Sequence, residues 1–126
     1  MEMPIPHDNS NIVSSWDVLN GQEVQGACVV IGGGLVGAET AEYLANKGHQ
    51  VTIVEMMDKI AAGESTTVLP LMMKDFADHN VKQLVNTKVD HIENNIVYTA
   101  NDQIKADTII NALGSKKNIF DDSSIT

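Results

Sequence analysis

The 126-residue sequence contains no arginine, and 17 acidic residues outnumber its eight lysines, which gives a formal charge of −9. Proteins that follow a nucleic-acid backbone neutralise its phosphates with clustered arginine and lysine. The composition therefore argues against DNA and RNA as partners. No apolar run approaches the roughly 20 residues that a membrane-spanning helix requires, so we expect no membrane insertion.

Cysteine is nearly absent as well. Cys28 is the one cysteine in the sequence and lies in an apolar stretch, so no internal disulfide or CxxC redox pair can form within this chain, and we expect a buried, unreactive thiol. The first nine residues lack the basic and apolar regions of a secretory signal, which favours a cytoplasmic location. The four histidines are scattered, without metal-ligand spacing: His7, His49, His79 and His91. The sequence therefore predicts no metal site, and it contains no recognisable catalytic set.

A strand, a tight turn and a helix are predicted in the first half of the chain. Residues 27–31 are apolar without alternation, as in a parallel strand buried on both faces. The glycine-rich turn 32–37 follows, and a helical pattern then continues to a C-terminal cap at Gly48. Residues 51–54 form a second short strand that ends at Glu55. The spacing leaves room only for a helix between the strands, so this segment is predicted to be a βαβ unit.

Each glycine of the GxGxxG pattern has a separate predicted role. Gly32 permits the tight turn, Gly34 carries no side chain where the backbone must approach a pyrophosphate, and Gly37 allows close packing of the helix. The free N–H groups at Gly34, Leu35 and Val36 lie at the positive end of the helix dipole. They are expected to bind a diphosphate without any lysine or arginine.

Glu55 follows the second strand at the roughly 20-residue offset where a carboxylate accepts hydrogen bonds from the adenosine ribose. A 2′-phosphate would be repelled by this carboxylate, and the chain has no arginine to neutralise the phosphate. Lys59 is the only cation nearby in the sequence. The cofactor prediction is therefore NAD(H), with NADP(H) less favoured.

The remaining pattern predicts an α/β fold: a three-layer, Rossmann-like parallel sheet with an antiparallel β-meander crossover. An amphipathic helix with an early proline is expected around Leu69–Phe76, and the methionines at 56, 57, 72 and 73 are expected to fill the core. Short strand-like pieces follow, at Val81–Val85, Val89–Glu93, Ile96–Thr99 and Gln103–Ala106. The last three are predicted to form the meander, with Asn94–Asn95 as a two-residue hairpin turn.

Residues 107–114 return to a buried apolar strand, which is predicted to rejoin the parallel sheet beside the first strand. Three segments are distinguished on this basis. Residues 1–26 are expected to be a lead-in outside the core, with a short capped helical turn at 14–19. Residues 27–118 form the predicted NAD(H)-binding domain, and residues 119–126 form a C-terminal tail.

These features resemble a known group, the NAD(P)H-binding domain inserted into FAD-dependent pyridine nucleotide-disulfide-type oxidoreductases. The resemblance covers nearly the whole chain, through the runs Pro4–Pro6, Trp16–Leu19, Val30–Glu39, Val51–Met56 and Ala112–Gly114. It is strongest toward the 2-enoate reductase, 2,4-dienoyl-CoA reductase and NADH oxidase group. In that group the domain holds NAD(P)H against the flavin of a neighbouring FAD-binding domain.

The resemblance also implies additional site residues. Glu39 matches a helix glutamate near the nicotinamide, and 112–114 match a second glycine-ended strand beside the cofactor. The candidate cofactor-binding residues are Gly32, Gly33, Gly34, Leu35, Val36, Gly37, Glu39, Glu55, Met56, Ala112 and Gly114.

The FAD-binding glycine motif, the iron–sulfur cysteines and the FMN barrel of such enzymes are missing from this sequence. We therefore expect a fragment that binds NADH without turnover, with FAD and its domain belonging to the rest of a flavoprotein oxidoreductase. Two alternatives stay open: a free-standing module that senses NAD or an adenine nucleotide, and a methyltransferase core that binds S-adenosylmethionine.

Overall fold

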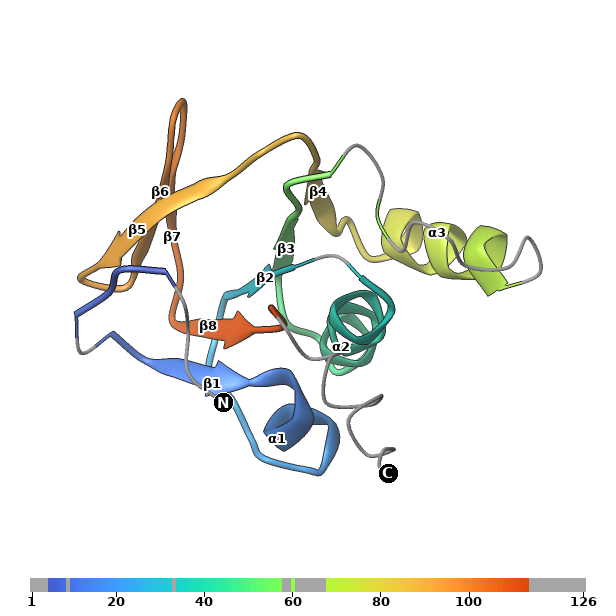
Figure 1. Cartoon of the computed structure of the whole chain (residues 1–126). Coiled ribbons are helices and arrows are strands. Elements are labelled where there is room, and N and C mark those ends of the chain that lie inside the picture. Colours follow the sequence, from blue (N-terminus) through green and yellow to red (C-terminus); the bar gives the residue numbers. More distant parts are fainter. Residues whose placement is uncertain (1–4, 9, 33, 58–59, 61–67, 114–126) are drawn as a thin grey trace, which may run out of the picture.

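The computed structural model describes residues 5–8, 10–32, 34–57, 60 and 68–113. In chain order the elements are β1 (Ile12–Ser14), α1 (Ser15–Leu19), β2 (Cys28–Ile31), α2 (Leu35–Asn46), β3 (Val51–Val54), α3 (Val68–Asp78), β4 (Lys82–Leu84), β5 (Val89–Glu93), β6 (Ile96–Thr99), β7 (Gln103–Lys105) and β8 (Thr108–Asn111). Figure 1 shows their arrangement in space.

Five of the strands form a parallel sheet in the order β1-β8-β2-β3-β4 (Figure 1). β2 lies at its centre, where Val30 pairs with Ile53 of β3 on one side and with Ile110 of β8 on the other. All four residues of β2 are buried, because other layers cover both faces of the sheet. This double coverage explains why its sequence is apolar without alternation.

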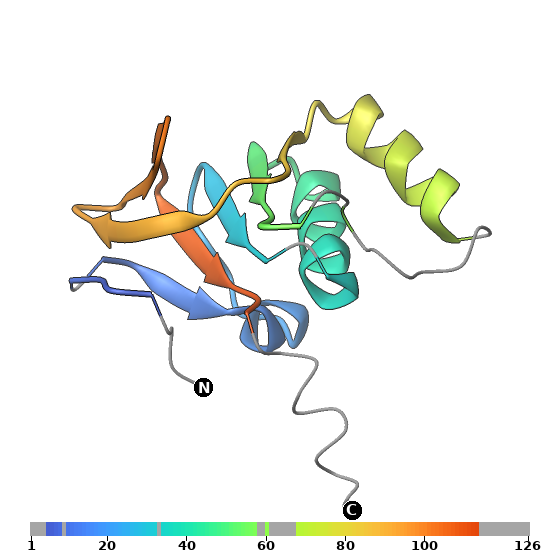
Figure 2. The same ribbon diagram turned by 45° about the horizontal axis from the view of Figure 1, so that its top comes forward.

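The two faces of the sheet are covered by different layers (Figure 2). Val30 and Ile110 pack in a core cluster that includes residues of α1, α2 and α3. Val29 and Ile109 point to the opposite face and pack with Ile92 of the three-stranded antiparallel sheet β5-β6-β7. The predicted three-layer α/β fold with an antiparallel meander is therefore confirmed, and β8 returns beside β2 as predicted.

Local backbone geometry explains the predicted hairpin turn and the predicted end of the helix α2. Asn94 and Asn95 have φ of 55° and 60°, which are the two left-handed positions that a tight hairpin turn needs. At the end of α2, the His49 N–H donates to Leu44 O at 3.1 Å and the Gly48 N–H donates to Ala45 O at 3.0 Å. This pattern closes the helix, and Gly48, with φ of 96°, occupies its left-handed position.

α3 confirms the predicted amphipathic helix, but the methionine prediction is wrong in part. Met72 and Phe76 are buried and Leu71 is exposed, as expected for a helix with one face on the core. Met56 and Met57, by contrast, are 62% and 56% exposed. They follow the carboxyl end of β3, beyond the sheet edge, where neither covering layer reaches them.

The prediction that residues 1–26 lie outside the core is wrong for β1 and α1. β1 pairs in parallel with β8, and Val18 of α1 is fully buried in the cluster that contains Val30. The Ser14 hydroxyl accepts a hydrogen bond from the Trp16 N–H at 3.1 Å, which confirms the predicted cap of the short helix. A three-residue strand shows no periodicity, and its partner lies near the other end of the chain. The tail at 119–126 lies outside the described residues.

No helix in the described part of the chain is both long and apolar enough to cross a membrane.

A pair of carboxyl groups joins α2 to α3. A hydrogen bond with Asp75, together with burial and with repulsion from Asp75 and Glu39, raises the pKa of Glu42 from its ordinary value of 4.5 to about 7. The folded chain therefore holds a proton that the unfolded chain releases at lower pH. Between about pH 4.5 and 7, this difference reduces the stability of the fold as the pH rises.

We predict that Glu42→Gln removes this pH dependence, because an amide keeps a donor toward Asp75 and carries no charge. At pH 8 the variant should exceed the original chain in free energy of unfolding by roughly 1 kcal/mol, after allowance for solvent screening. At pH 4.5 the two should be equal. Urea unfolding across this pH range measures both quantities, with the exposed Glu23→Gln as control. An unchanged slope in Glu42→Gln would contradict the assignment.

Candidate functional site

The turn after β2 brings the ends of three strands together. Gly32 has φ of 106°, a conformation that favours glycine. Its N–H donates to Val54 O of β3 at 2.9 Å, and the Ala112 N–H after β8 donates to Ile31 O at 2.9 Å. A Cβ on Gly32 would lie 3.2 Å from the carbonyl carbon and oxygen of Ala112. The turn is therefore confined on both sides.

Helix α2 begins directly against this turn. A Cβ on Gly37 would lie 1.9 Å from the carbonyl oxygen of Gly32 and 3.1 Å from the Ala112 Cβ. No side chain fits at such a distance from a backbone oxygen. Gly37 thus permits the close packing that the sequence analysis assigned to it, and it fixes where the helix begins relative to the sheet.

The N-terminus of α2 is open toward solvent. Gly34 is its N-cap residue, with φ of −69° and ψ of −174°, and no side chain caps the helix there. A Cβ on Gly34 would meet no atom within 4 Å. Leu35 and Val36 begin the helix, with the Leu35 side chain half-buried and the Val36 side chain buried. The uncapped first turn presents backbone N–H groups at the positive end of the helix dipole, an arrangement suited to an anion.

Glu55 lies at the same edge of the sheet, one residue beyond β3. Its backbone is fixed by a hydrogen bond from its N–H to Leu84 O at 2.8 Å and by one to its carbonyl from the Thr87 N–H at 2.9 Å. The carboxylate accepts from the Met57 N–H through Oε2 at 2.6 Å. The half-buried carboxylate is therefore held in place beside the turn, and the exposed Met56 lies next to it in the chain.

The end of β8 adds a residue that the sequence analysis missed. Asn111 is 5% exposed and is in register with Ile31, directly before the Ala112 that packs on the turn. Its Oδ1 accepts from the Leu113 N–H at 3.0 Å. The sequence signal that could have identified Asn111 was its polar side chain at the end of a mostly apolar strand.

The other predicted site residues are more distant or lie outside the described part. Glu39 is exposed on α2, beyond the first turn of the helix. Gly33 and Gly114 lie outside the described residues, as does Lys59. The structure thus brings together Gly32, Gly34, Leu35, Val36, Gly37, Glu55, Met56 and Ala112 along one edge of the sheet.

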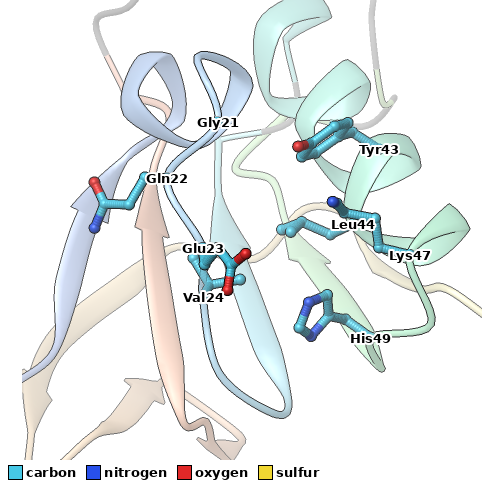
Figure 3. Close-up of a pocket in the computed structure, with 8 residues that line it drawn as sticks. All are labelled: Gly21, Gln22, Glu23, Val24, Tyr43, Leu44, Lys47 and His49. Atoms are coloured by element: carbon cyan, nitrogen blue, oxygen red, sulfur yellow. The ribbon is translucent and has the colours of Figure 1, made fainter.

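A pocket of about 220 Å³ lies at the other end of α2 (Figure 3). The loop before β2 lines one side, including Glu23, and the last turns of α2 line the other. The Lys47 ammonium lies 5.3 Å from the centre of the Tyr43 ring, over which it stacks. The lining residues of the pocket outside α2 come shortly before β2 and β3 in the chain, so the pocket is separate from the glycine-rich turn, which follows the carboxyl end of β2.

The chain shows no sign of thiol or metal chemistry within its described residues. Burial, together with repulsion from Asp107, raises the pKa of the Cys28 thiol to about 11, so the thiol stays protonated at neutral pH. No group of three or more histidine, cysteine or carboxylate side chains that could hold a metal occurs in the described part of the chain.

The fold and this edge define a class of nucleotide-binding domain, and comparison with known proteins gives the family. The family described as pyridine nucleotide-disulphide oxidoreductase matches residues 2–124. The chain belongs to this family, whose members are FAD- and NAD(P)H-dependent oxidoreductases. The predicted family resemblance is confirmed. The predicted cofactors, a nicotinamide dinucleotide and FAD, agree with those of the family.

Several relatives are much longer than this chain. Bilirubin reductase from Mediterraneibacter gnavus is 45% identical over 122 residues, which cover 93% of this chain and 18% of that protein. NADH oxidase from Thermoanaerobacter brockii is 54% identical over 57 residues, which cover 43% of this chain and 9% of that protein. The chain therefore spans less than a fifth of the length of either relative.

Solved structures show the same fold. A 2-naphthoyl-CoA reductase in complex with 2-naphthoyl-CoA matches with a TM-score of 0.80 and 26% identity, covering 89% of this chain and 18% of that one. The water-forming NADH oxidase from Lactobacillus brevis, bound to NADH, matches with a TM-score of 0.71 and 21% identity, covering 90% of this chain and 28% of that one. The latter likeness supports the fold alone.

We predict unequal effects on stability for two glycine substitutions in the same turn. Gly37→Ala should lower the free energy of unfolding by about 1–3 kcal/mol, because the clash with Gly32 outweighs the gain of about 1 kcal/mol in helix propensity. Gly34→Ala places its methyl in open space and should change stability by less than about 0.5 kcal/mol. Urea unfolding of both variants measures the difference. Equal effects would contradict the packing described for Gly37.

Proposed function

We propose that this chain binds NADH at the glycine-rich turn, within a flavin-dependent oxidoreductase. The observation that carries the proposal is the open, uncapped N-terminus of α2 at Gly34, which lies at the same sheet edge as the Glu55 carboxylate. The first feature suits a diphosphate and the second suits a ribose diol. Family membership supports a pyridine nucleotide as the ligand that carries both groups.

The residues divide the binding between backbone and side chain. The N–H groups at the start of α2 are proposed to hold the diphosphate, and the space before Gly34 lets the phosphates approach the backbone. Because the Met57 N–H holds one oxygen of Glu55, the carboxylate is already oriented when the ribose hydroxyls arrive. Ala112, packed on the turn, borders the path toward the nicotinamide.

The proposal favours NADH over NADPH. A 2′-phosphate on the adenosine ribose would lie against the Glu55 carboxylate, and like charges at short range repel. The chain has no arginine that could pair with such a phosphate. The net charge of −9 adds a general repulsion of the more highly charged cofactor.

When bound, the reduced nicotinamide supplies a hydride, and we propose that a flavin held by a separate FAD-binding domain accepts it. The length of the relatives supports this division, because the chain spans 18% of bilirubin reductase. In this account the chain holds and orients the donor, and the domain that binds the final substrate sets what is reduced. The chain by itself is expected to bind NADH without turning it over.

We predict that Gly34→Ala weakens NADH binding about tenfold or more, even though it leaves the fold intact. The methyl would occupy the space through which the diphosphate reaches the N–H groups of α2. Isothermal titration calorimetry with NADH measures the loss. The added methyl meets no protein atom, so a change in affinity would not come from misfolding. Unchanged affinity would show that the turn has a purely structural role.

Glu55→Gln tests the cofactor preference. Loss of the charged acceptor should weaken NADH binding by about tenfold, and NADPH binding should weaken less or improve because the repulsion is removed. The ratio of the two dissociation constants is the measured quantity. Glu93→Gln, an exposed glutamate on the antiparallel sheet, is the matched control and should leave the ratio unchanged. An unaltered ratio in Glu55→Gln would exclude Glu55 as the residue that selects NADH.

A further inference from the structure

The carboxyl end of β8 carries a buried amide that the proposed function does not yet use. Asn111 is one of four buried polar residues in the described part of the chain, with Ser15, Thr40 and Thr108. The hydroxyls of both threonines donate to backbone carbonyls, at 2.7 Å to Val36 and 3.1 Å to Gln25. The Ser15 hydroxyl has no partner among the described residues. Asn111 differs from both threonines because only one half of its amide, the oxygen, is hydrogen-bonded.

The orientation of this amide is fixed by its one recorded hydrogen bond. A backbone N–H needs an acceptor, so the atom 3.0 Å from Leu113 N is the Asn111 oxygen. The amino group Nδ2 lies in the same amide plane and points away from Leu113 N. Nδ2 has two hydrogens to donate, and among the described residues no hydrogen bond from it is recorded. The described side-chain atoms that are shielded from water without a partner are Ser15 Oγ and Trp16 Nε1, so Nδ2 of Asn111 still reaches solvent and is open to a ligand.

The position of Asn111 relates it to the second half of a dinucleotide. β3 and β8 flank β2 on opposite sides (Figure 1). Glu55 directly follows β3 and Asn111 ends β8, so the two residues lie on opposite sides of the end of β2. From β2 the chain continues to β3 on one side, and it later returns to β8 on the other side of β2. The switch point of the sheet therefore lies between β2 and β8. A dinucleotide bound across it, with its adenosine ribose at Glu55, extends its other nucleoside toward β8.

We propose that Asn111 Nδ2 donates a hydrogen bond to the nicotinamide riboside half of the bound cofactor. This inference rests on the proposed function. A ligand that covers the end of β8 removes Nδ2 from water, so it must provide an acceptor, and the riboside offers hydroxyl and carboxamide oxygens. The Leu113 N–H holds the amide in the required orientation before the cofactor binds. Asn111 thereby positions the nicotinamide end of the cofactor, as Glu55 positions the adenosine end.

Two substitutions separate the donor from the rest of the side chain. Asn111→Asp keeps an oxygen that can accept from the Leu113 N–H but removes the Nδ2 donor, and Asn111→Leu removes both polar atoms without adding charge. Calorimetric titration with NADH and with ADP, which lacks the nicotinamide riboside, is the assay. Thermal unfolding of each variant controls for folding. If Asn111→Leu fails to fold, Asn111→Asp still provides the comparison.

Both variants should bind NADH about tenfold more weakly, while the loss for ADP stays clearly smaller. Equal losses for the two ligands, or no loss for NADH, would overturn the role of Asn111 and leave the proposed function standing. Failure of the unmodified chain to bind NADH would instead overturn the proposed function, and the inference with it.

Discussion

The contact between Gly37 and the carbonyl oxygen of Gly32 is the constraint on which the rest of the site depends. The space there is too small for any side chain, since a Cβ would approach the oxygen to 1.9 Å. Because the helix packs directly on the turn, its N-terminus lies at the carboxyl edge of the sheet, between the ends of β3 and β8. This backbone contact thus places the uncapped N–H groups of α2 at the edge where the parallel pairing of β3 and β8 with β2 places Glu55 and Asn111.

The electrostatics of this edge are compatible with the proposal that an acidic chain holds an anion here. With a net charge of −9 and no arginine, the protein offers little general attraction to a phosphate. The proposed contact with the diphosphate is therefore local and made by the backbone, through the dipole and free N–H groups of α2. In the proposed complex the flanking side chains act on the two nucleosides, Glu55 as an acceptor of hydrogen bonds and Asn111 as a donor. Such a division favours a cofactor without an additional phosphate.

Much of this arrangement could be predicted from the sequence, and the exceptions have physical causes. The apolar run of β2, the glycine turn and the Asn94–Asn95 hairpin are local patterns, and each was predicted correctly. β1 was missed because its pairing with β8 joins distant parts of the chain and its three residues show no period. The raised pKa of Glu42 depends on the contact between α2 and α3, and the half-satisfied amide of Asn111 depends on side-chain geometry, so neither is visible in a linear pattern.

Calorimetric titration of the unmodified chain with NADH, NADPH and S-adenosylmethionine tests the central claim most directly. The account predicts a single site for NADH, with NADPH bound at least about tenfold more weakly because its 2′-phosphate meets the Glu55 carboxylate. S-adenosylmethionine should produce no binding heat. Tighter binding of NADPH, or binding of S-adenosylmethionine without NADH, would contradict the assignment of this edge as a site for NADH.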